Sequence, residues 1–416
     1  MARIVQKFGG TSVGSVERII RVADRVIAEA DAGHEVIVVV SAMGKTTDQL
    51  VTLANELTVS PSAREMDMLL STGEQVTTSL LAMALQNRGM SAASITGWQA
   101  GIQTESVPGN ARIVNIDTTR LEQLLASGTI AIVAGFQGIS QEQDITTLGR
   151  GGSDTTAVAL AAALHADRCD IYTDVPGVFT TDPRVVKDAR KLQRISYDEM
   201  LELAHLGAGV LHPRAVEFAK NYQIPLTVRS SMTFEEGTRI EEEVKMENRS
   251  VVRGIAFEDQ ITRMTLFRMP RKEKNLSAVF STLARHRINV DIIIQSVTSE
   301  NSSNLSFSVK DSDVEEASRI LEQEQERLHF EKMEAESGLA KVSIVGSGMI
   351  SNPGVAAEMF DKLAQEDIDI KMVSTSEIKV STVIEKQHMQ KATQALHNCF
   401  HLGEEMPVEG VPVTHT

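Results

Sequence analysis

Apolar segments of two kinds alternate along roughly the first 240 residues. Compact apolar runs of strand length lie at residues 4–8, 35–40, 129–136 and 170–175. Runs without polar alternation are typical of strands that are buried on both faces of a sheet. Residues 16–30 instead place Ile19, Val22 and Val26 at helical spacing, and the alanine-rich residues 155–166 also predict a helix. This order of elements predicts an α/β sandwich with a largely parallel sheet.

The pattern changes at residues 235–250, an acidic and apolar-poor stretch that we interpret as a linker. Beyond it the chain repeats itself. Val279-Phe280 and Leu283-Ala284 correspond to Met359-Phe360 and Leu363-Ala364, each 80 residues further on. Each copy has the order strand, helix, strand, strand, helix of a small ferredoxin-like βαββαβ unit. Two such modules after an α/β domain favour a paired sensor; the alternative is that the two modules only dimerise.

Composition limits the class of protein. A chain of 416 residues is too long for one compact domain, and with only 4 % aromatic residues its cores must be mainly aliphatic. The net charge of −15 argues against nucleic acid or an anionic membrane surface as the main partner. Cys169 and Cys399 lie far apart, which disfavours a disulfide framework. Because no signal peptide and no apolar stretch of about 20 residues is present, we expect a soluble cytoplasmic protein.

The first predicted strand ends in Lys7-Phe8-Gly9-Gly10, shortly before a predicted helix. Glycines allow backbone N–H groups to approach a ligand, and at a strand-to-helix turn such groups form a cradle for an anion. Lys7 adds a positive charge that suits phosphate. An ordinary strand–turn–helix with a surface lysine explains the same residues, so both interpretations stay open.

Gly44-Lys45-Thr46 matches the end of a P-loop, but that motif also requires a glycine at position 39, which is Val39. The chain contains no GxGxxG motif either. A P-loop enzyme and a dinucleotide-binding fold therefore lose their main support. We interpret Lys45 as a solvated loop residue.

Glycines and an arginine make Gly149-Arg150-Gly151-Gly152-Ser153-Asp154 the segment richest in candidate chemistry. Arg150 can hold a carboxylate or a phosphate through two parallel hydrogen bonds. Ser153 or Asp154 is expected to cap the helix predicted from Thr155. Capping alone explains neither Arg150 nor the glycines, so an anion site is preferred.

Polar residues also follow the predicted strand at residues 170–175. Thr173 and Asp174 stand at its carboxyl end, before a Pro176-Gly177 turn, Phe179 and Arg184. Open α/β sheets bind ligands at the carboxyl ends of their strands. An ordinary turn and a solvated arginine explain these residues equally well.

Two further kinds of candidate are weaker on the sequence alone. Glu74 follows Gly73 in an acidic segment, where a solvated carboxylate at a helix end is the simpler interpretation. His205 and His212 lie far from any cysteine or pair of carboxylates. We therefore expect no metal site built by the chain itself.

Taken together, these segments resemble the aspartate kinases of the amino-acid kinase superfamily. The resemblance rests on Lys7-Phe8-Gly9-Gly10-Thr11-Ser12, Ser41-Ala42-Met43-Gly44, Arg64-Glu65-Met66-Asp67, residues 149–154 and Thr173-Asp174-Val175-Pro176-Gly177-Val178. These motifs occur in the family's order and spacing, and the resemblance covers essentially the whole chain. It points to the monofunctional, lysine-responsive bacterial enzymes with two ACT domains.

The resemblance implies a three-layer αβα sandwich with a mostly parallel sheet, followed by two ferredoxin-like ACT domains. The implied boundaries are residues 1–240 for the catalytic domain, 241–260 for a linker with the first regulatory strand, and 261–335 and 340–410 for the ACT domains. The implied reaction is ATP-dependent phosphorylation of the side-chain carboxylate of L-aspartate to 4-phospho-L-aspartate, the first step towards lysine, threonine and methionine. Mg²⁺ would arrive with the ATP.

The family also implies residue roles. Lys7 would neutralise the transferring phosphoryl group and Asp154 would hold Lys7 in place, because the attacking carboxylate is already an anion. Glu74 would hold the substrate ammonium, and Arg150 a substrate carboxylate. The other implied substrate contacts are Ser41, Thr47, Gly151, Gly152 and Ser153. The implied ATP contacts are Lys7, Phe8, Gly9, Gly10, Thr173, Asp174, Phe179 and Arg184.

The chain departs from the family pattern at two places. Gly209 stands where many relatives carry a lysine near the nucleotide, and Arg271-Lys272-Glu273-Lys274 replaces an Asp-x-Pro-Gly type loop in the first ACT copy. The second copy keeps its loop at residues 348–355. The implied effector contacts are Asn289, Val290, Asp291 and Gln295 in the first copy and Asp369, Ile370, Ser376 and Glu377 in the second. The effector would be lysine, alone or together with threonine.

Subunit composition and two rival functions also stay open. The assembly would be a homo-oligomer or a complex with a shorter regulatory subunit made from an internal start, for which Met246 is suitably placed. A kinase of glutamate or acetylglutamate is disfavoured by the paired sensor modules and by Glu65-Met66-Asp67. A non-catalytic amino-acid sensor would require the catalytic positions to be altered, and Lys7, Arg150 and Asp154 are all present.

Overall fold

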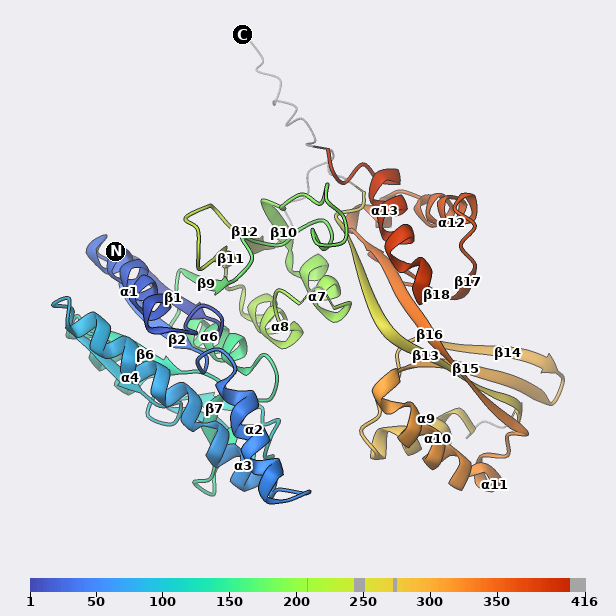
Figure 1. Cartoon of the computed structure of the whole chain (residues 1–416), viewed down its shortest axis with the longest axis horizontal. Coiled ribbons are helices and arrows are strands. Elements are labelled where there is room, and N and C mark those ends of the chain that lie inside the picture. Colours follow the sequence, from blue (N-terminus) through green and yellow to red (C-terminus); the bar gives the residue numbers. More distant parts are fainter. Residues whose placement is uncertain (208, 243–250, 272–274, 405–416) are drawn as a thin grey trace, which may run out of the picture. The chain divides into compact units, whose positions relative to one another are not determined.

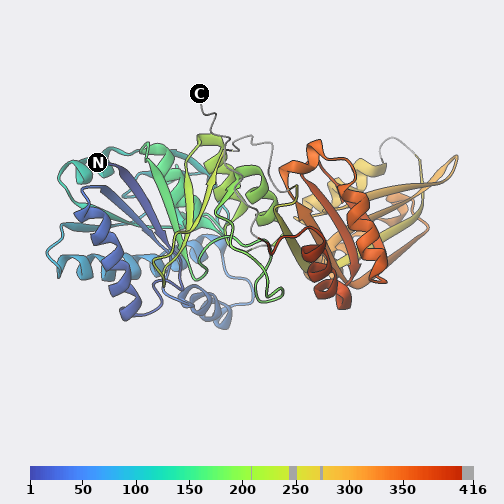
Figure 2. The same cartoon turned by 90° about the horizontal axis from the view of Figure 1, so that it is seen from above.

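The computed structural model describes residues 1–207, 209–242, 251–271 and 275–404, which form two compact units (Figures 1 and 2). The N-terminal unit comprises Met1–Phe179, Lys191–His205 and the described residues from Gly209 to 242. The C-terminal unit comprises Thr180–Arg190, residues 206–207 and the described residues from 251 on. Met246 and most of the altered loop of the first ACT copy lie outside the described residues.

The N-terminal unit is built on an eight-stranded sheet in the order β10-β12-β11-β9-β1-β2-β6-β3. Every neighbouring pair is parallel except β11 with β12. The strands are β1 (Arg3–Phe8), β2 (Glu35–Val40), β3 (Ala92–Ile95), β6 (Ile130–Ala134), β9 (Arg168–Thr173), β10 (Arg194–Ser196), β11 (Leu226–Ser230) and β12 (Thr238–Glu241). The predicted mostly parallel sheet is confirmed.

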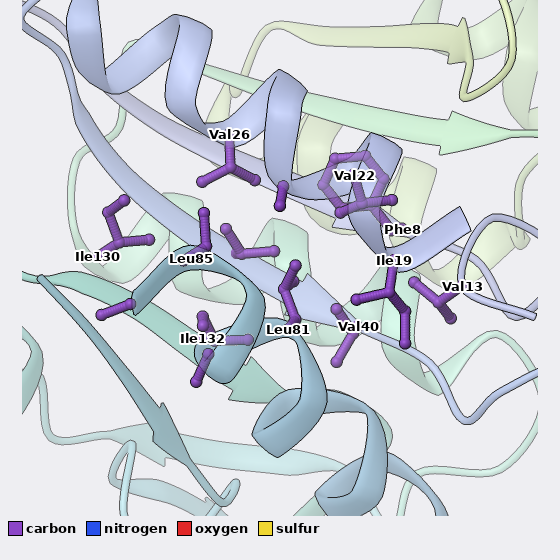
Figure 3. Packing of buried hydrophobic residues seen from close by; sticks show 14 of the residues in the cluster. Phe8, Val13, Ile19, Val22, Val26, Val40, Leu81, Leu85, Ile130 and Ile132 are labelled. Atoms are coloured by element: carbon purple, nitrogen blue, oxygen red, sulfur yellow. The ribbon is translucent and has the colours of Figure 1, made fainter. Parts of the chain in front are cut away.

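Helices cover both faces of this sheet. The side chains of α1 (Val16–Asp31) and α4 (Thr72–Gln86) pack on one face, where Phe8, Val40 and Ile132 meet Val22 and Leu81 (Figure 3). Lys7 points to the opposite face, because neighbouring residues of a strand alternate, and there it meets α6 (Gly152–Ala163). The unit's other helices are α2 (Thr46–Leu57), α3 (Ala63–Leu70), α5 (Thr119–Ala126), α7 (Tyr197–His205) and α8 (Pro213–Tyr222).

A second, four-stranded sheet in the N-terminal unit has the order β5-β4-β7-β8. Its strands are β4 (Ile102–Thr104), β5 (Ile113–Ile116), β7 (Gln137–Ile139) and β8 (Ile145–Thr147). The loop after β8 leads directly into α6, so this small sheet positions residues 148–151 at the start of that helix.

The C-terminal unit contains the predicted repeat. Its six-stranded sheet has the order β14-β15-β13-β16-β18-β17, and the equivalent Leu283 and Leu363 are both fully buried, each in the core of its own copy. The strands are β13 (Gly254–Pro270), β14 (Ile293–Ser299), β15 (Ser302–Lys310), β16 (Lys332–Val345), β17 (Ile370–Thr375) and β18 (Lys379–Glu385). The helices are α9 (Asn275–Arg285), α10 (Val314–Gln323), α11 (Gln325–Leu328), α12 (Val355–Gln365) and α13 (Met389–Cys399).

The two copies share their longest strands. β13 and β16 pair over most of their length, and in Figure 1 they run side by side from the helices of the second copy to those of the first. The beginning of β13, residues 254–258, pairs with residues 341–345, which also pair with β18 of the second copy. The sheet of the second copy therefore includes residues 254–258, which precede the first copy in the sequence. None of the described helices is both long and apolar enough to cross a bilayer.

Candidate active site

A cavity of about 950 Å³ in the N-terminal unit collects the predicted catalytic and substrate residues. It is lined by residues that come from β1, the loop after β2, α2, α4 and the start of α6. Among them are Lys7, Ser41, Thr47, Glu74, Arg150, Gly151, Gly152, Ser153 and Asp154, together with Gly10. Residues spread over almost 150 positions of sequence thus lie around one space.

Lys7 and Asp154 form an ion pair at this cavity. The Lys7 Nζ lies 2.5 Å from Asp154 Oδ1, and each residue is only 9 % exposed. Lys7 sits one residue before the end of β1, and Asp154 lies in the first turn of α6. The positive end of the α6 dipole lies at this helix start and adds to the positive potential. The pair can hold a fixed ammonium group beside an anionic ligand.

The capping prediction for this helix is wrong. α6 begins at Gly152 rather than at Thr155, its N-cap is Gly151, and no side chain caps it. Gly151 has φ +68°, and a Cβ there would lie 2.1 Å from Cγ of His212. Because glycine alone fits this left-handed turn against the histidine ring, the helix starts earlier. Ser153 and Asp154 are consequently inside the first turn, with their side chains available to the cavity.

Glu74 is buried, so its interpretation as a solvated helix-end carboxylate is wrong. It lies in the first turn of α4, is 3 % exposed, and accepts a hydrogen bond from the Ala42 N–H at 3.1 Å through Oε1. Oε2 is buried without a hydrogen-bond partner among the described residues. Burial raises the pKa of Glu74 to about 8. Such a carboxylate at a cavity wall is suited to a cationic group of a ligand.

Asp67 organises the cavity, although we singled it out only as part of a family motif. It is 1 % exposed and accepts hydrogen bonds from the Gly109 N–H (2.9 Å), the Thr147 N–H (2.9 Å) and the Thr147 hydroxyl (2.6 Å). These bonds tie α3 to β8 and to the loop before β5. The motif Arg64-Glu65-Met66-Asp67 drew attention to this residue, but its burial and its three hydrogen bonds depend on segments that are distant in the sequence.

The predicted nucleotide residues lie mainly at the carboxyl ends of adjacent strands. The Gly9 N–H donates to the Tyr172 carbonyl at 3.2 Å, which joins the end of β1 to the end of β9, where Thr173 and Asp174 follow. The Phe8 side chain is fully buried and stacks on Tyr172 at 4.6 Å between ring centroids. Only the backbone of Phe8 could therefore touch a ligand.

Phe179 and Arg184 lie further along the same segment. Phe179 bridges to Lys191 within the N-terminal unit, whereas Arg184 is in the part assigned to the C-terminal unit. The Arg184 side chain is 88 % exposed and pairs with Asp182 at 2.7 Å. Apart from Lys7 and Gly10, the predicted ATP contacts do not line the 950 Å³ cavity.

The predicted effector residues lie along or beside β14 and β17, the edge strands of the C-terminal sheet. In the first copy, Asp291 pairs with the buried Lys341 at 2.5 Å, and Gln295 donates to the Ser303 hydroxyl. In the second copy, Asp369 pairs with Lys371 at 2.8 Å. Asn289, Val290, Ile370, Ser376 and Glu377 flank these positions.

Comparison with known proteins identifies the family. The Amino acid kinase family matches residues 2–230, and the ACT domain matches residues 269–325 and 342–400. An aspartokinase of Bacillus sp. (strain MGA3) is 67 % identical over 402 residues, which is 97 % of this chain and 98 % of that protein. The chain belongs to the aspartokinase family. Aspartokinase 2 of Bacillus subtilis (strain 168) is 66 % identical and covers 97 % of this chain and 99 % of its own length.

Solved aspartokinases have the same fold. E. coli aspartokinase III in complex with aspartate and ADP (R-state) is 31 % identical, with a TM-score of 0.80 over 95 % of this chain and 99 % of that one. The same E. coli enzyme in complex with lysine and aspartate (T-state) is also 31 % identical, with a TM-score of 0.73 over 95 % and 98 %. The family resemblance and the enzyme class predicted for this aspartokinase are confirmed.

Proposed function

We propose that this aspartokinase transfers the γ-phosphoryl group of ATP to the side-chain carboxylate of L-aspartate. The products are ADP and 4-phospho-L-aspartate, the first intermediate towards lysine, threonine and methionine. The observation that carries the proposal is the cavity in which the buried Lys7–Asp154 pair, Arg150 and the unpartnered carboxylate oxygen of Glu74 lie together. The aspartate and ADP bound by the related E. coli enzyme support it.

The proposed substrate contacts follow from charge. Oε2 of Glu74 would accept a hydrogen bond from the α-ammonium of aspartate, and Arg150 would hold the α-carboxylate through its guanidinium. Ser41, Thr47 and Ser153, with the backbone of Gly151 and Gly152, line the remaining wall. This arrangement leaves the side-chain carboxylate to face Lys7.

The proposed transfer needs no strong base. A carboxylate oxygen of aspartate attacks the γ-phosphorus, and the bond from that phosphorus to the β–γ bridging oxygen breaks, so that ADP leaves. Lys7 stabilises the negative charge on the phosphoryl oxygens, and Asp154 positions Lys7 at 2.5 Å. Catalysis is thus mainly positioning and electrostatic stabilisation.

The strand ends beside the cavity are the proposed nucleotide site. Gly9 and Gly10 carry no side chain that would keep a phosphate from their backbone N–H groups, and Gly10 also packs so closely on the loop after β2 that a Cβ there would lie 2.9 Å from the Ala42 carbonyl oxygen. Thr173, Asp174, Phe179 and Arg184 would contact the rest of the nucleotide. Among the described residues no group of three or more His, Cys, Asp or Glu side chains could hold a metal ion. We therefore propose that Mg²⁺ is held chiefly by the ATP phosphates, whose charge it would neutralise.

Feedback control by lysine, alone or together with threonine, is proposed for the ACT copies. The ACT match and the lysine-bound structure of the related E. coli enzyme support it. The proposed effector contacts are those along β14 and β17. We further propose a cytoplasmic homo-oligomer, or a complex with a regulatory subunit started near Met246.

The reaction is tested by trapping the acyl phosphate with hydroxylamine. Purified protein with ATP, Mg²⁺ and L-aspartate should form the hydroxamate, and omission of any one of them should abolish it. Glutamate and acetylglutamate in place of aspartate form the control panel. Absence of product with aspartate, or preference for another acid of the panel, would overturn the proposed function.

A further inference from the structure

Residues Thr180–Arg190 connect two strands of the N-terminal sheet, β9 and β10, yet they belong to the C-terminal unit. The segment starts directly after Phe179 and contains Arg184, both of which are proposed ATP contacts. What holds this segment in place therefore bears on the proposed nucleotide site.

Thr180 fixes the segment within the C-terminal unit. The residue is fully buried, and its carbonyl accepts a hydrogen bond from the Ile255 N–H of β13 at 2.7 Å. Its hydroxyl lies 2.9 Å from Nε2 of His397 in α13. All of these atoms lie in the C-terminal unit.

His397 is suited to this contact. It is 1 % exposed, and it lies beside Leu396 of the second ACT core. Thr180 Oγ1 already accepts the Arg190 N–H at 3.0 Å, so its own proton is available to Nε2. Burial lowers the pKa of His397 and thereby favours the neutral ring that can accept it, while Asp188 and Arg190 nearby act in opposite directions.

The hydrogen bonds of Thr180 continue into a hairpin. The Thr180 N–H donates to the Arg190 carbonyl at 2.9 Å, the next pair is the Phe179–Lys191 bridge, and the Leu192 N–H donates to the Val178 carbonyl at 2.8 Å. A paired hairpin transmits displacement better than a free loop, because its two arms constrain each other. Thr180 and Phe179 are therefore neighbours in one paired hairpin.

We propose that His397 is a positioning residue for the nucleotide. Through the Thr180 hydroxyl it restrains the hairpin of residues 178–192, which carries the proposed ATP contacts Phe179 and Arg184. This inference rests on the proposed function, since it assumes that these two residues contact the nucleotide. A residue of α13, the last helix of the second ACT copy, would thus contribute to ATP binding, although it is far along the chain from every proposed active-site residue.

The test uses two pairs of variants of the full chain. His397→Phe and Thr180→Val remove the hydrogen bond while keeping most of the volume, whereas His397→Gln and Thr180→Ser retain a group that can form it. We expect KM for ATP to rise about five- to tenfold in the first pair, the effect of one buried hydrogen bond, and about twofold or less in the second. KM for aspartate should stay unchanged in all four, and Asn398→Ala, an exposed neighbour in α13, should behave as the wild type.

A double variant and a binding measurement make the result decisive. His397→Phe with Thr180→Val should be no worse than either single change, because both remove the same bond. An unchanged KM for ATP in folded His397→Phe and Thr180→Val would overturn the proposal. The proposal would also fail if KM rose equally for ATP and aspartate and if His397→Gln and Thr180→Ser did not restore it. Titration with MgATP measures the affinity for the nucleotide without turnover and should show the same loss. If the wild type formed no acyl phosphate, the proposed function would fail while this titration still decided the role of His397.

Discussion

Lys7 and Glu74 are both charged residues that the fold buries at one cavity, and their surroundings differ. Lys7 has Asp154 at 2.5 Å. Glu74 accepts a hydrogen bond from the Ala42 N–H on Oε1, and its Oε2 has no hydrogen-bond partner among the described residues. Burial without a compensating positive charge is what raises the Glu74 pKa to about 8. This difference supports the proposed roles, in which Lys7 would meet a phosphoryl group and Glu74 an ammonium group.

Glu74 predicts a pH dependence. The ionised form is the one that can hold the substrate ammonium, and kcat/KM reports the pKa of the free enzyme. Since that pKa is about 8, kcat/KM for aspartate should rise with pH and level off above about 8. Glu74→Gln should remove this rise and increase KM for aspartate by about tenfold or more, the effect of a charged hydrogen bond. Glu56→Gln, at an exposed site outside every named motif, is the matched control, and an unaltered pH profile in Glu74→Gln would exclude this role.

Lys7 predicts a loss of turnover. Lys7→Ala removes the proposed charge on the transferring phosphoryl group, and kcat should fall by about 10²- to 10³-fold. Calorimetry should still detect effector binding to the C-terminal unit of this variant, because that unit is compact by itself. Lys45→Ala removes an exposed lysine and should keep wild-type turnover. Full activity in Lys7→Ala would show that its assigned role is wrong.

At the scale of elements, the start of α6 and the long strand β13 depend on distant contacts. The capping rule placed the helix start at Thr155, but Gly151 turns the chain against His212 and α6 begins at Gly152. The sequence placed the first regulatory strand in residues 241–260 and the first ACT copy at residues 261–335, whereas β13 (Gly254–Pro270) runs across this boundary and its beginning pairs within the sheet of the second copy. In both cases the local pattern predicted the type of element correctly, and packing against a remote segment decided its extent.

Gly151→Ala tests the start of α6. The new Cβ would lie 2.1 Å from the His212 ring and would also occupy a left-handed backbone position. Gly89 has a similar φ of +80° but nothing within 4 Å of its Cβ, so Gly89→Ala isolates the backbone cost of about 1 kcal/mol. We expect Gly151→Ala to lower Tm clearly more than Gly89→Ala and to reduce kcat, as measured by thermal unfolding and the hydroxamate assay. Equal shifts in Tm would refute the steric argument.

At the scale of the whole chain, two units with separate cores are joined by a backbone that crosses between them several times. The loop at residues 180–190 belongs by sequence to the catalytic part and by packing to the unit that contains the ACT copies. Regulation requires that an effector bind one global state better than another. The segment of residues 180–190 connects the C-terminal unit covalently to Phe179, a proposed nucleotide contact. A change of state in the C-terminal unit can therefore be passed along the backbone.

Feedback control is tested by titrating activity with lysine and threonine, separately and together. We expect lysine, alone or with threonine, to inhibit, with a coupling of about 5- to 150-fold in apparent affinity. Asp291→Asn and Asp369→Asn should weaken the response without changing activity in the absence of effector. A flat response to both amino acids would remove the feedback proposal and leave the kinase reaction standing.

The sequence by itself determined the parallel α/β core, the internal repeat and the family, because apolar periodicity and ordered motifs are local properties of the chain. The strands at Glu35–Val40 and Arg3–Phe8 lie where the apolar runs predicted them. Only the tertiary structure decided the burial of Glu74, the bonds of Asp67, the strand shared by the two ACT copies and the contact of Thr180 with His397. Each of these depends on residues that are distant in sequence, and no local pattern carries that information.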